Sequence, residues 1–302
     1  MSKRLVGAIL FRSKIRQMSA WGNTDTMHGN IECDFPADFG TRLILERLAQ
    51  VLDPELDESI VDLGFVRSVR ADSGHADVTL QLPTSWCAMN FAYLMAEDAR
   101  RALLEVEGVQ YATIRLGEHC AAREIEAAVN NGRSFAEAFP EEGEGDLAAL
   151  RQAFLRKGFF IRQERLLCEL RVAGCSAPEI CALRLGEILI EDDLTTIRQP
   201  GAAPRKGGQA ATLRRYLQRR AELGLDCRDD AQLIIDLEGK PFSADRVQAH
   251  YEVTRTMRVA LEANSSFCRA LMSLRHLADA APSRREPEEQ ETCTVRTDTT
   301  SL

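Results

Sequence analysis

The most regular alternation of polar and apolar residues along the chain lies at 75–82. A period of two predicts a half-buried strand, and a turn at 72–74 joins it to the apolar, branched stretch at 60–70 as a hairpin. Apolar residues at helical spacing predict a helix at 88–104, and a further strand follows at 109–116. Strand, helix and strand with short joints form a βαβ unit, so its two strands should run parallel.

The apolar patterns elsewhere are mostly helical. A helix is expected to begin at Thr41, to keep apolar residues through Leu52 on one face and to stop at Asp53-Pro54. Beyond residue 146 the predicted elements are helices at 147–170, 178–185, 212–223, 244–263 and 267–277, and a strand or hairpin at 188–197. The predicted fold class is therefore α+β: a small α/β domain with a helix, a β-hairpin and a βαβ unit, joined to a mainly α-helical second domain.

Shifts in composition divide the chain. Residues 141–146 contain four acids and two glycines, which is typical of a linker, and the last twenty or so residues are rich in Pro, Glu, Arg and Thr without an apolar period. The expected segments are a poorly ordered extension at 1–40, a first domain at 41–140, an acidic linker at 141–150, a second domain at 151–280 and a disordered tail at 281–302.

Composition narrows the class of protein. The chain has 302 residues, 45% of them hydrophobic and 28% charged, which excludes disorder of the whole chain. Its net charge of -8 disfavours a general nucleic-acid or anionic-membrane coat, so such contacts would be local. The nine cysteines include no CxxC pair, which favours reduced thiols in a cytoplasmic protein over a disulfide scaffold or a self-contained zinc ribbon. No apolar run is long enough for a transmembrane helix, so no membrane contact is expected.

Cys87 is the first candidate for chemistry. It stands between a predicted strand and the first turn of a predicted helix, where partial positive charge favours a thiolate that can ligate metal or act as a nucleophile. In a parallel βαβ unit, His119 and Cys120 should emerge at the same sheet edge. A thiolate, an imidazole and a second thiol suit zinc or iron. The alternative is that Cys87 is a small buried apolar residue and His119 caps the backbone.

Residues 41–117 contain a set of linked motifs, which in chain order are Asp53-Pro54-Glu55, Ser59-Ile60-Val61-Asp62-Leu63-Gly64, the alternating strand, Pro83-Thr84-Ser85-Trp86-Cys87 and Val106-Glu107-Gly108-Val109. Taken together, these motifs resemble the iron–sulfur assembly family that includes PaaD and SufT. The resemblance implies that Cys87 is the reactive cysteine, that Asp53 and Glu55 are the loop acids, and that an iron–sulfur cluster or iron is held transiently for delivery, without catalytic turnover. Ser85-Trp86 departs from the Pro-Gly or Pro-Ala that is common before the family's cysteine; the indole could shield the thiol or contact a client.

A second set of motif residues lies in 151–278: the segment from Leu170 to Leu185, and further along Lys206, Arg275 and His276. These residues resemble the catalytic domain of tyrosine recombinases and integrases in degenerate form. The segment is similar to their helix–turn–helix, and Glu179, Lys206, Arg275 and His276 match motif positions. Ser176 stands at the first arginine position and Met272 at the first histidine position, and no tyrosine follows Tyr251. Without the attacking hydroxyl, strand cleavage is excluded.

A basic stretch gives this second region its own candidate surface. Between Arg205 and Arg220 there are six basic residues and no acid. The candidate phosphate or partner contacts are Lys206, Arg214, Arg215, Arg219, Arg220, Arg275 and His276. The favoured interpretation is a solvated helix face outside the Leu213/Leu217 stripe; the other two are DNA binding and docking of an acidic client.

Together these patterns predict an accessory protein that matures a client metalloenzyme. Fusions of such a carrier domain to a helical region resemble proteins encoded beside binuclear-iron monooxygenases, which suggests that class of client. The expected partners are the client or an iron–sulfur scaffold protein, and a homodimer could share one cluster between two Cys87 thiolates because one thiol cannot hold a cluster alone. A DNA-binding regulator built on a dead recombinase domain is the alternative. An enzyme with Cys87 as nucleophile ranks third, since no triad is evident.

Overall fold

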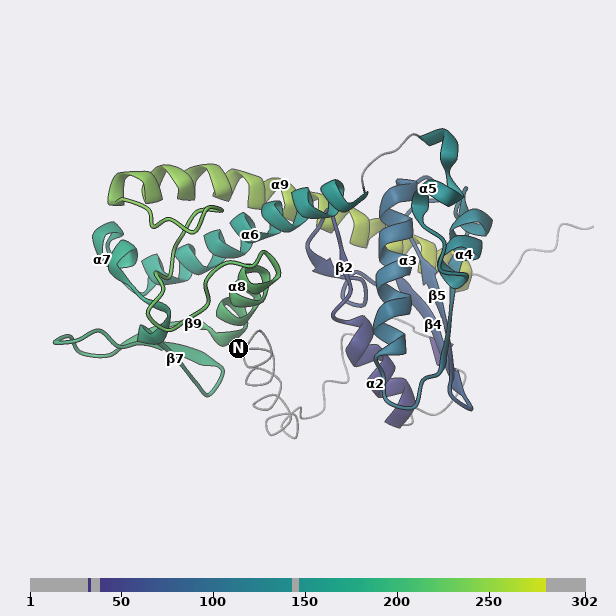
Figure 1. Cartoon of the computed structure of the whole chain (residues 1–302), viewed down its shortest axis with the longest axis horizontal. Coiled ribbons are helices and arrows are strands. Elements are labelled where there is room, and N and C mark those ends of the chain that lie inside the picture. Colours follow the sequence, from purple (N-terminus) through teal and green to yellow (C-terminus); the bar gives the residue numbers. More distant parts are fainter. Residues whose placement is uncertain (1–31, 34–38, 143–146, 281–302) are drawn as a thin grey trace, which may run out of the picture.

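The computed structural model describes residues 32–33, 39–142 and 147–280. The expected tail at 281–302, nearly all of the expected extension at 1–40 and the centre of the expected linker lie outside the described residues. Two bodies are visible in Figure 1: a sheet unit at 39–142 and a helical unit at 147–280. The mixed α+β class predicted from the sequence is confirmed.

A four-stranded sheet organises the sheet unit, in the order β1-β4-β5-β6. Its strands are β1 (Glu32–Cys33), β4 (Val66–Asp72), β5 (His75–Gln81) and β6 (Tyr111–Gly117). The β4–β5 pair is the predicted antiparallel hairpin, and β5 and β6 are parallel neighbours in register from His75↔Tyr111 to Gln81↔Gly117. The crossover between them is α3 (Met89–Leu104), so the predicted βαβ unit is confirmed.

Helices and a small ladder complete the sheet unit. They are α2 (Phe39–Leu48), β2 (Leu52–Asp53), β3 (Glu58–Ser59), α4 (Ala122–Asn130), α5 (Phe135–Ala138) and the 3-10 turn η2 (Pro140–Glu142). The first predicted helix is four residues too long, because Leu52 and Asp53 pair with β3 instead. The predicted strand at 60–70 begins only at Val66, because the Ser59 hydroxyl accepts the N–H groups of Val61 and Asp62 and turns the chain.

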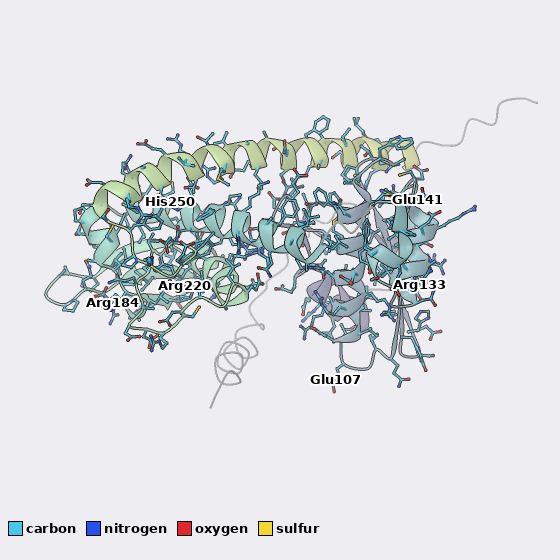
Figure 2. All side chains as sticks on the ribbon, turned by 45° about the horizontal axis from the view of Figure 1, so that its top comes forward. Glu107, Arg133, Glu141, Arg184, Arg220 and His250 are labelled. Carbon is cyan, nitrogen blue, oxygen red and sulfur yellow. The ribbon has the colours of Figure 1, made fainter. Side chains whose placement is uncertain are left out.

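The helical unit contains two long helices and a three-stranded antiparallel meander. Its elements are α6 (Leu147–Val172), α7 (Ala177–Ala182), η3 (Leu185–Glu187), β7 (Ile188–Glu191), β8 (Leu194–Ile197), β9 (Arg205–Gln209), α8 (Ala210–Glu222) and α9 (Ala244–Ala280). Its core includes Phe159 of α6, Tyr216 of α8 and Leu233, together with residues of α7, the meander and α9. Figure 2 shows Arg220 and His250 within this unit, and Glu107 and Arg133 in the sheet unit.

One continuous helix, α9, replaces the two helices predicted at 244–263 and 267–277. The polar residues between the two predicted helices do not interrupt α9, because their hydroxyl groups find partners. The Ser266 hydroxyl donates to the Glu262 carbonyl of the same helix at 2.8 Å, and the Ser265 hydroxyl donates to Glu58 at 2.9 Å. The helix runs from α7 across the helical unit to the sheet unit (Figure 1). Its Met272 is 3% exposed and belongs to the core of the sheet unit.

None of the helices in the described part of the chain combines the length and the apolar character needed to cross a membrane.

Candidate functional site

Cys87 lies in the loop that connects the end of β5 to the start of α3, one residue before the helix N-cap at Ala88. Its thiol is half-buried, and the Thr84 hydroxyl lies 3.4 Å from Sγ. The backbone N–H of Cys87 donates to the Thr84 carbonyl at 3.4 Å, which folds residues 84–87 into a tight turn. The sequence places this thiol correctly at the end of a strand and the start of a helix.

His119 reaches Cys87 from the end of β6, as the parallel topology predicts. Its Nδ1 accepts the N–H of Ala121 at 3.1 Å, so Nε2 carries the proton and donates to the Cys87 carbonyl at 2.8 Å. Beside it, the Cys120 N–H donates to the Ser85 carbonyl at 2.9 Å. His119 is 7% exposed; its Nε2 holds the Cys87 loop, while its Nδ1 accepts from the backbone of its own loop at Ala121.

The role of His119 and Cys120 as metal ligands stays a prediction. The Cys120 thiol is exposed, and within residues 39–142 and 147–280 no three His, Cys, Asp or Glu side chains are grouped as a metal site would need. The arrangement around Cys87 therefore offers one thiol on a well-fixed loop and not a preformed cage of ligands.

Asp53 is a buried acid in β2, only 7% exposed. Its Oδ1 accepts the N–H groups of Glu55 at 2.9 Å and Leu56 at 2.8 Å, so the carboxylate shapes the β2–β3 turn. Burial raises the pKa of Asp53 to about 6, although the two hydrogen bonds pull in the opposite direction. Glu55 is partly exposed, and its carbonyl accepts a hydrogen bond from Lys157 of α6 at 3.3 Å.

Cys268 joins this neighbourhood from α9. Burial raises the pKa of its thiol, and the nearby negative charges of Asp53 and Glu55 raise it further. Sequence reasoning missed Cys268 because it lies in a different unit, and no local pattern indicates that α9 reaches the sheet edge.

Arg275 fastens the end of α9 to the Cys87 loop. Its guanidinium donates to the Leu82 carbonyl at 2.5 Å, the Ser85 hydroxyl at 3.4 Å and the Glu118 carboxylate at 2.7 Å. One side chain therefore bridges the loops that follow β5 and β6. Arg275, which matches a phosphate-binding position of the recombinases in the sequence, is bound to protein groups in this structure.

The other residues of the recombinase-like pattern are not gathered around Arg275. Lys206 is exposed on β9, and Glu179 of α7 pairs with Arg205 at 3.0 Å. These elements lie at the opposite end of α9 from Arg275 and the half-buried His276 (Figure 1). Contact of these residues with phosphate or a partner stays a prediction.

The predicted solvated face of α8 is wrong for Arg219 and Arg220, which are 4% and 1% exposed. Arg220 donates to the carbonyls of Gln232 and Leu233 at 2.9 and 3.0 Å, so backbone oxygens satisfy its buried charge. Arg214 and Arg215 remain exposed.

Asp57 joins the two units through buried charges. Its carboxylate pairs with Arg162 of α6 at 2.7 and 2.9 Å and also accepts a hydrogen bond from Arg219 of α8. All three side chains are at most 8% exposed. The positive φ of Asp57, 54°, is one that Asp and Asn adopt more readily than most residues. Neither the apolar pattern nor a motif marks this junction.

Comparison with known proteins identifies one part of the chain. No curated protein matches the chain. The family model described as iron-sulfur cluster assembly protein matches residues 42–115, which include Asp53, Asp57 and Cys87. The resemblance of the second region to recombinases stays a prediction. The match at 42–115 identifies an iron–sulfur cluster assembly domain of the PaaD/SufT type and supports a general role in that process.

Proposed function

We propose that this protein carries an iron–sulfur cluster or iron as cargo and delivers it to a client metalloenzyme, with Cys87 as the cargo ligand. The observation that carries the proposal is the position of Cys87 on a fixed loop at the edge of the matched domain, where its thiol is half-buried. Loop residues at the ends of parallel strands commonly hold ligands in α/β folds.

The donors around Cys87 fit a transient cargo better than a resident cluster. Iron–sulfur clusters are usually held by about four thiolates. The described residues offer Cys87, with Cys268 close by, while both ring nitrogens of His119 are already hydrogen-bonded to the backbone, at Cys87 and at Ala121. The remaining ligands would come from the client, a scaffold protein or a second copy of this chain. Ligands shared between two proteins suit a carrier that must release what it holds.

Trp86 supports contact between the Cys87 loop and a partner. The indole is 82% exposed although it adjoins a half-buried cysteine. Exposed aromatic side chains are frequent anchors of protein interfaces. We infer that the client approaches over Trp86, while Arg275 of α9 holds the loop through Leu82 and Ser85.

The proposed client class, a binuclear-iron monooxygenase, rests on the resemblance of the fused architecture. DNA regulation is less well supported, because two of the four arginines of α8 that could contact phosphate are buried inside the protein.

Anaerobic reconstitution with iron and sulfide tests the role of Cys87. We expect the full chain to gain visible absorbance and to transfer its cluster to an apo-ferredoxin, and we expect Cys87→Ser to lose most of both. Cys227→Ser is the matched control, because Cys227 is half-buried in the helical unit and hydrogen-bonds to the Leu225 carbonyl.

Equal cluster content in Cys87→Ser and the unsubstituted chain would reject Cys87 as the cargo ligand. Loss of absorbance in Cys268→Ser as well would show that both thiols of this neighbourhood bind the cargo. Chromatographic mass before and after reconstitution distinguishes a shared cluster from a monomeric carrier, because a cluster held between two copies doubles the mass.

A further inference from the structure

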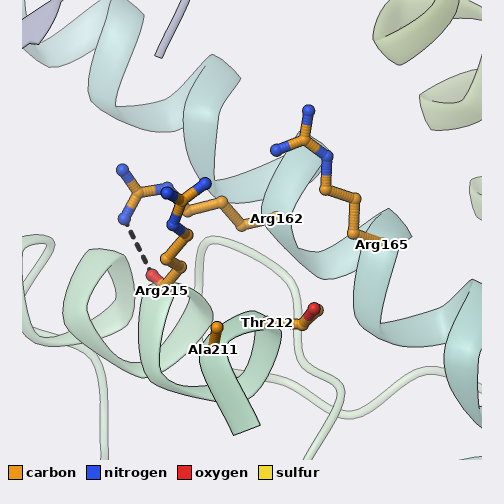
Figure 3. Close-up of a pocket in the computed structure, with 5 residues that line it drawn as sticks. All are labelled: Arg162, Arg165, Ala211, Thr212 and Arg215. Atoms are coloured by element: carbon orange, nitrogen blue, oxygen red, sulfur yellow. Dashed lines mark hydrogen bonds between the residues drawn. The ribbon is translucent and has the colours of Figure 1, made fainter. Parts of the chain in front are cut away.

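A small pocket lies between α6 and α8, on the helical unit's side of the junction (Figure 3). Its volume is about 90 Å³, and the residues that line it are Arg162, Arg165, Ala211, Thr212 and Arg215. Three of them are arginines and none is acidic. In a protein with a net charge of -8, such a concentration of positive charge calls for a physical explanation.

Arg162 gives the pocket a fixed cation. Its side chain is 4% exposed and bound to Asp57 by two hydrogen bonds. The remaining guanidinium nitrogen, Nη1, donates to the Arg215 carbonyl at 2.8 Å, as the dashed line in Figure 3 shows. This network fixes the buried guanidinium before any ligand arrives, so little side-chain entropy would be lost on binding.

The other two arginines are weakly compensated. Arg165 lies 3.5 Å from Glu262, but Glu262 already pairs with Arg258 at 2.6 Å. Arg215 is exposed and has no carboxylate partner among the residues that the structure describes. Both side chains can therefore turn toward an incoming anion without breaking a strong ion pair.

Arg219 adds to the positive charge behind the pocket. It shares Asp57 with Arg162, and its buried Nε, which makes no hydrogen bond, lies 3.3 Å from Glu222 Oε2. Burial and the charge of Arg162 lower the pKa of Arg219. An anion in the pocket would offset this repulsion.

A larger cavity of about 470 Å³ adjoins the pocket and shares three of its arginines. It extends to the sheet unit, where Gln50, Ser59 and Asp62 line it. This volume falls within the roughly 300–1,000 Å³ typical of small-molecule sites. The amide, hydroxyl and carboxylate groups that line this cavity can hydrogen-bond to hydroxyl groups of a ligand, and the carboxylate would repel a second negative charge. The part of the ligand that lies there, its body, is therefore expected to carry hydroxyl groups and no second negative charge.

We infer that the junction binds the phosphate group of a small phosphorylated molecule through Arg162, Arg165 and Arg215. Guanidinium groups match the geometry of phosphate oxygens and can hydrogen-bond to two of them at once. The body of the ligand lies in the larger cavity, in contact with both units. This site goes beyond cluster delivery and does not use Cys87, so either proposal can fail without the other.

Calorimetric titration of the full chain at low salt tests the site, with inorganic phosphate and adenosine monophosphate as probes. We expect both to bind, and Arg215→Gln and Arg165→Gln to weaken binding by about tenfold or more, because each removes charge-assisted hydrogen bonds. Arg156→Gln is the matched control, since Arg156 is an exposed arginine on the same helix α6. Its affinity should equal that of the unsubstituted chain.

The relative affinities of the two probes show whether free phosphate or a phosphate monoester is the better ligand, and either result supports the site. Absence of binding at millimolar probe overturns the proposal, as does equal loss in the Arg156→Gln control. A short DNA duplex provides a further arm. If the duplex binds more tightly than the monophosphate and Arg215→Gln abolishes this binding, the arginines contact a nucleic-acid backbone and the small-molecule proposal is wrong.

Discussion

The Cys87 loop and the Asp57 junction lie in the same domain but are held by different kinds of interaction. Around Cys87 the bonds involve the backbone: His119 donates to the Cys87 carbonyl, and the Cys120 N–H donates to Ser85. At the junction the bonds join buried charges, with Asp57 between Arg162 and Arg219. The loop is held by neighbours within the sheet unit and by Arg275 of α9, whereas the junction exists only when α6 and α8 are in place.

This difference predicts how each region responds to substitution. A neutral hydrogen bond contributes about 0.5–1.5 kcal/mol, so a loop with several such bonds tolerates the loss of one. A buried charge that loses its partner costs about 3–5 kcal/mol, because desolvation is no longer compensated. The junction should therefore be the most sensitive point between the two units, and the loop should keep its shape while α9 changes.

The largest effect is expected from Asp57→Asn. Asn keeps the size of the side chain and its tolerance of a positive φ, so the change isolates the charge. Arg162 would be left buried without a carboxylate and Arg219 would keep only Glu222, so the free energy of unfolding should fall by about 3–5 kcal/mol. Urea unfolding measures this, with exposed Asp62→Asn as the control. Equal stability of the two variants would remove the distinction between the two regions.

Met272→Ala tests whether α9 belongs to the core of the sheet unit. The side chain is 3% exposed there, and its truncation should cost about 2–5 kcal/mol through lost burial and a new cavity. Leu274→Ala, at a position 62% exposed on the same helix, should change stability by less than about 0.5 kcal/mol. Similar losses in both variants, measured by thermal unfolding, would mean that α9 does not dock in this register.

The titration of Asp53 is expected to make the stability of the protein depend on pH. Its pKa is about 6 in the folded protein against an ordinary 3.8, so the folded state binds more protons than the unfolded state between these values. Stability from this group is therefore highest at low pH and falls as pH rises, by on the order of 2 kcal/mol between pH 4 and pH 7. Asp53→Asn keeps an oxygen to accept both backbone N–H groups and should remove this dependence.

Urea unfolding at several pH values checks this expectation. Asp53→Asn should be more stable than the unsubstituted chain at pH 7, and the two curves should converge toward pH 4. A constant difference across the range would show that Asp53 does not titrate within it. Asp62→Asn again provides the exposed reference.

The smallest effect is expected from Arg275→Ala at the Cys87 loop. The side chain binds a carbonyl, a hydroxyl and the exposed Glu118, so its loss should cost about 1 kcal/mol. The same change should speed alkylation of Cys87, followed by mass spectrometry, because α9 is then less firmly held over the loop. Arg123→Ala, on the exposed face of α4, should alter neither quantity. Unchanged alkylation in Arg275→Ala would show that α9 does not restrict access to the thiol.

Local sequence patterns were sufficient to predict much of the sheet unit. Alternation at 75–82, the helix before Glu105 and the strand before Gly117 determined the βαβ unit, and its parallel strands brought His119 to Cys87. Each of these features depends on residues close in sequence or on the handedness of one crossover, so periodicity alone was sufficient. The motif Asp53-Pro54-Glu55 likewise indicated a break in regular structure. The local reason is that the Asp53 side chain accepts hydrogen bonds from the backbone two and three residues ahead.

The sequence by itself determined the fold class, the place of Cys87 and the resemblance of residues 41–117 to an iron–sulfur assembly domain. Only the tertiary structure decided that α9 is one helix, that Arg275 bonds to the Cys87 loop with Cys268 on the same helix near Asp53, and that Arg219 is buried against Asp57. The physical reason is range. Hydrophobic periodicity indicates which face of an element is buried, but it does not indicate which charged residue from a distant part of the chain packs against that face. An arginine outside the apolar stripe of its helix is therefore buried when a carboxylate of another unit pairs with it.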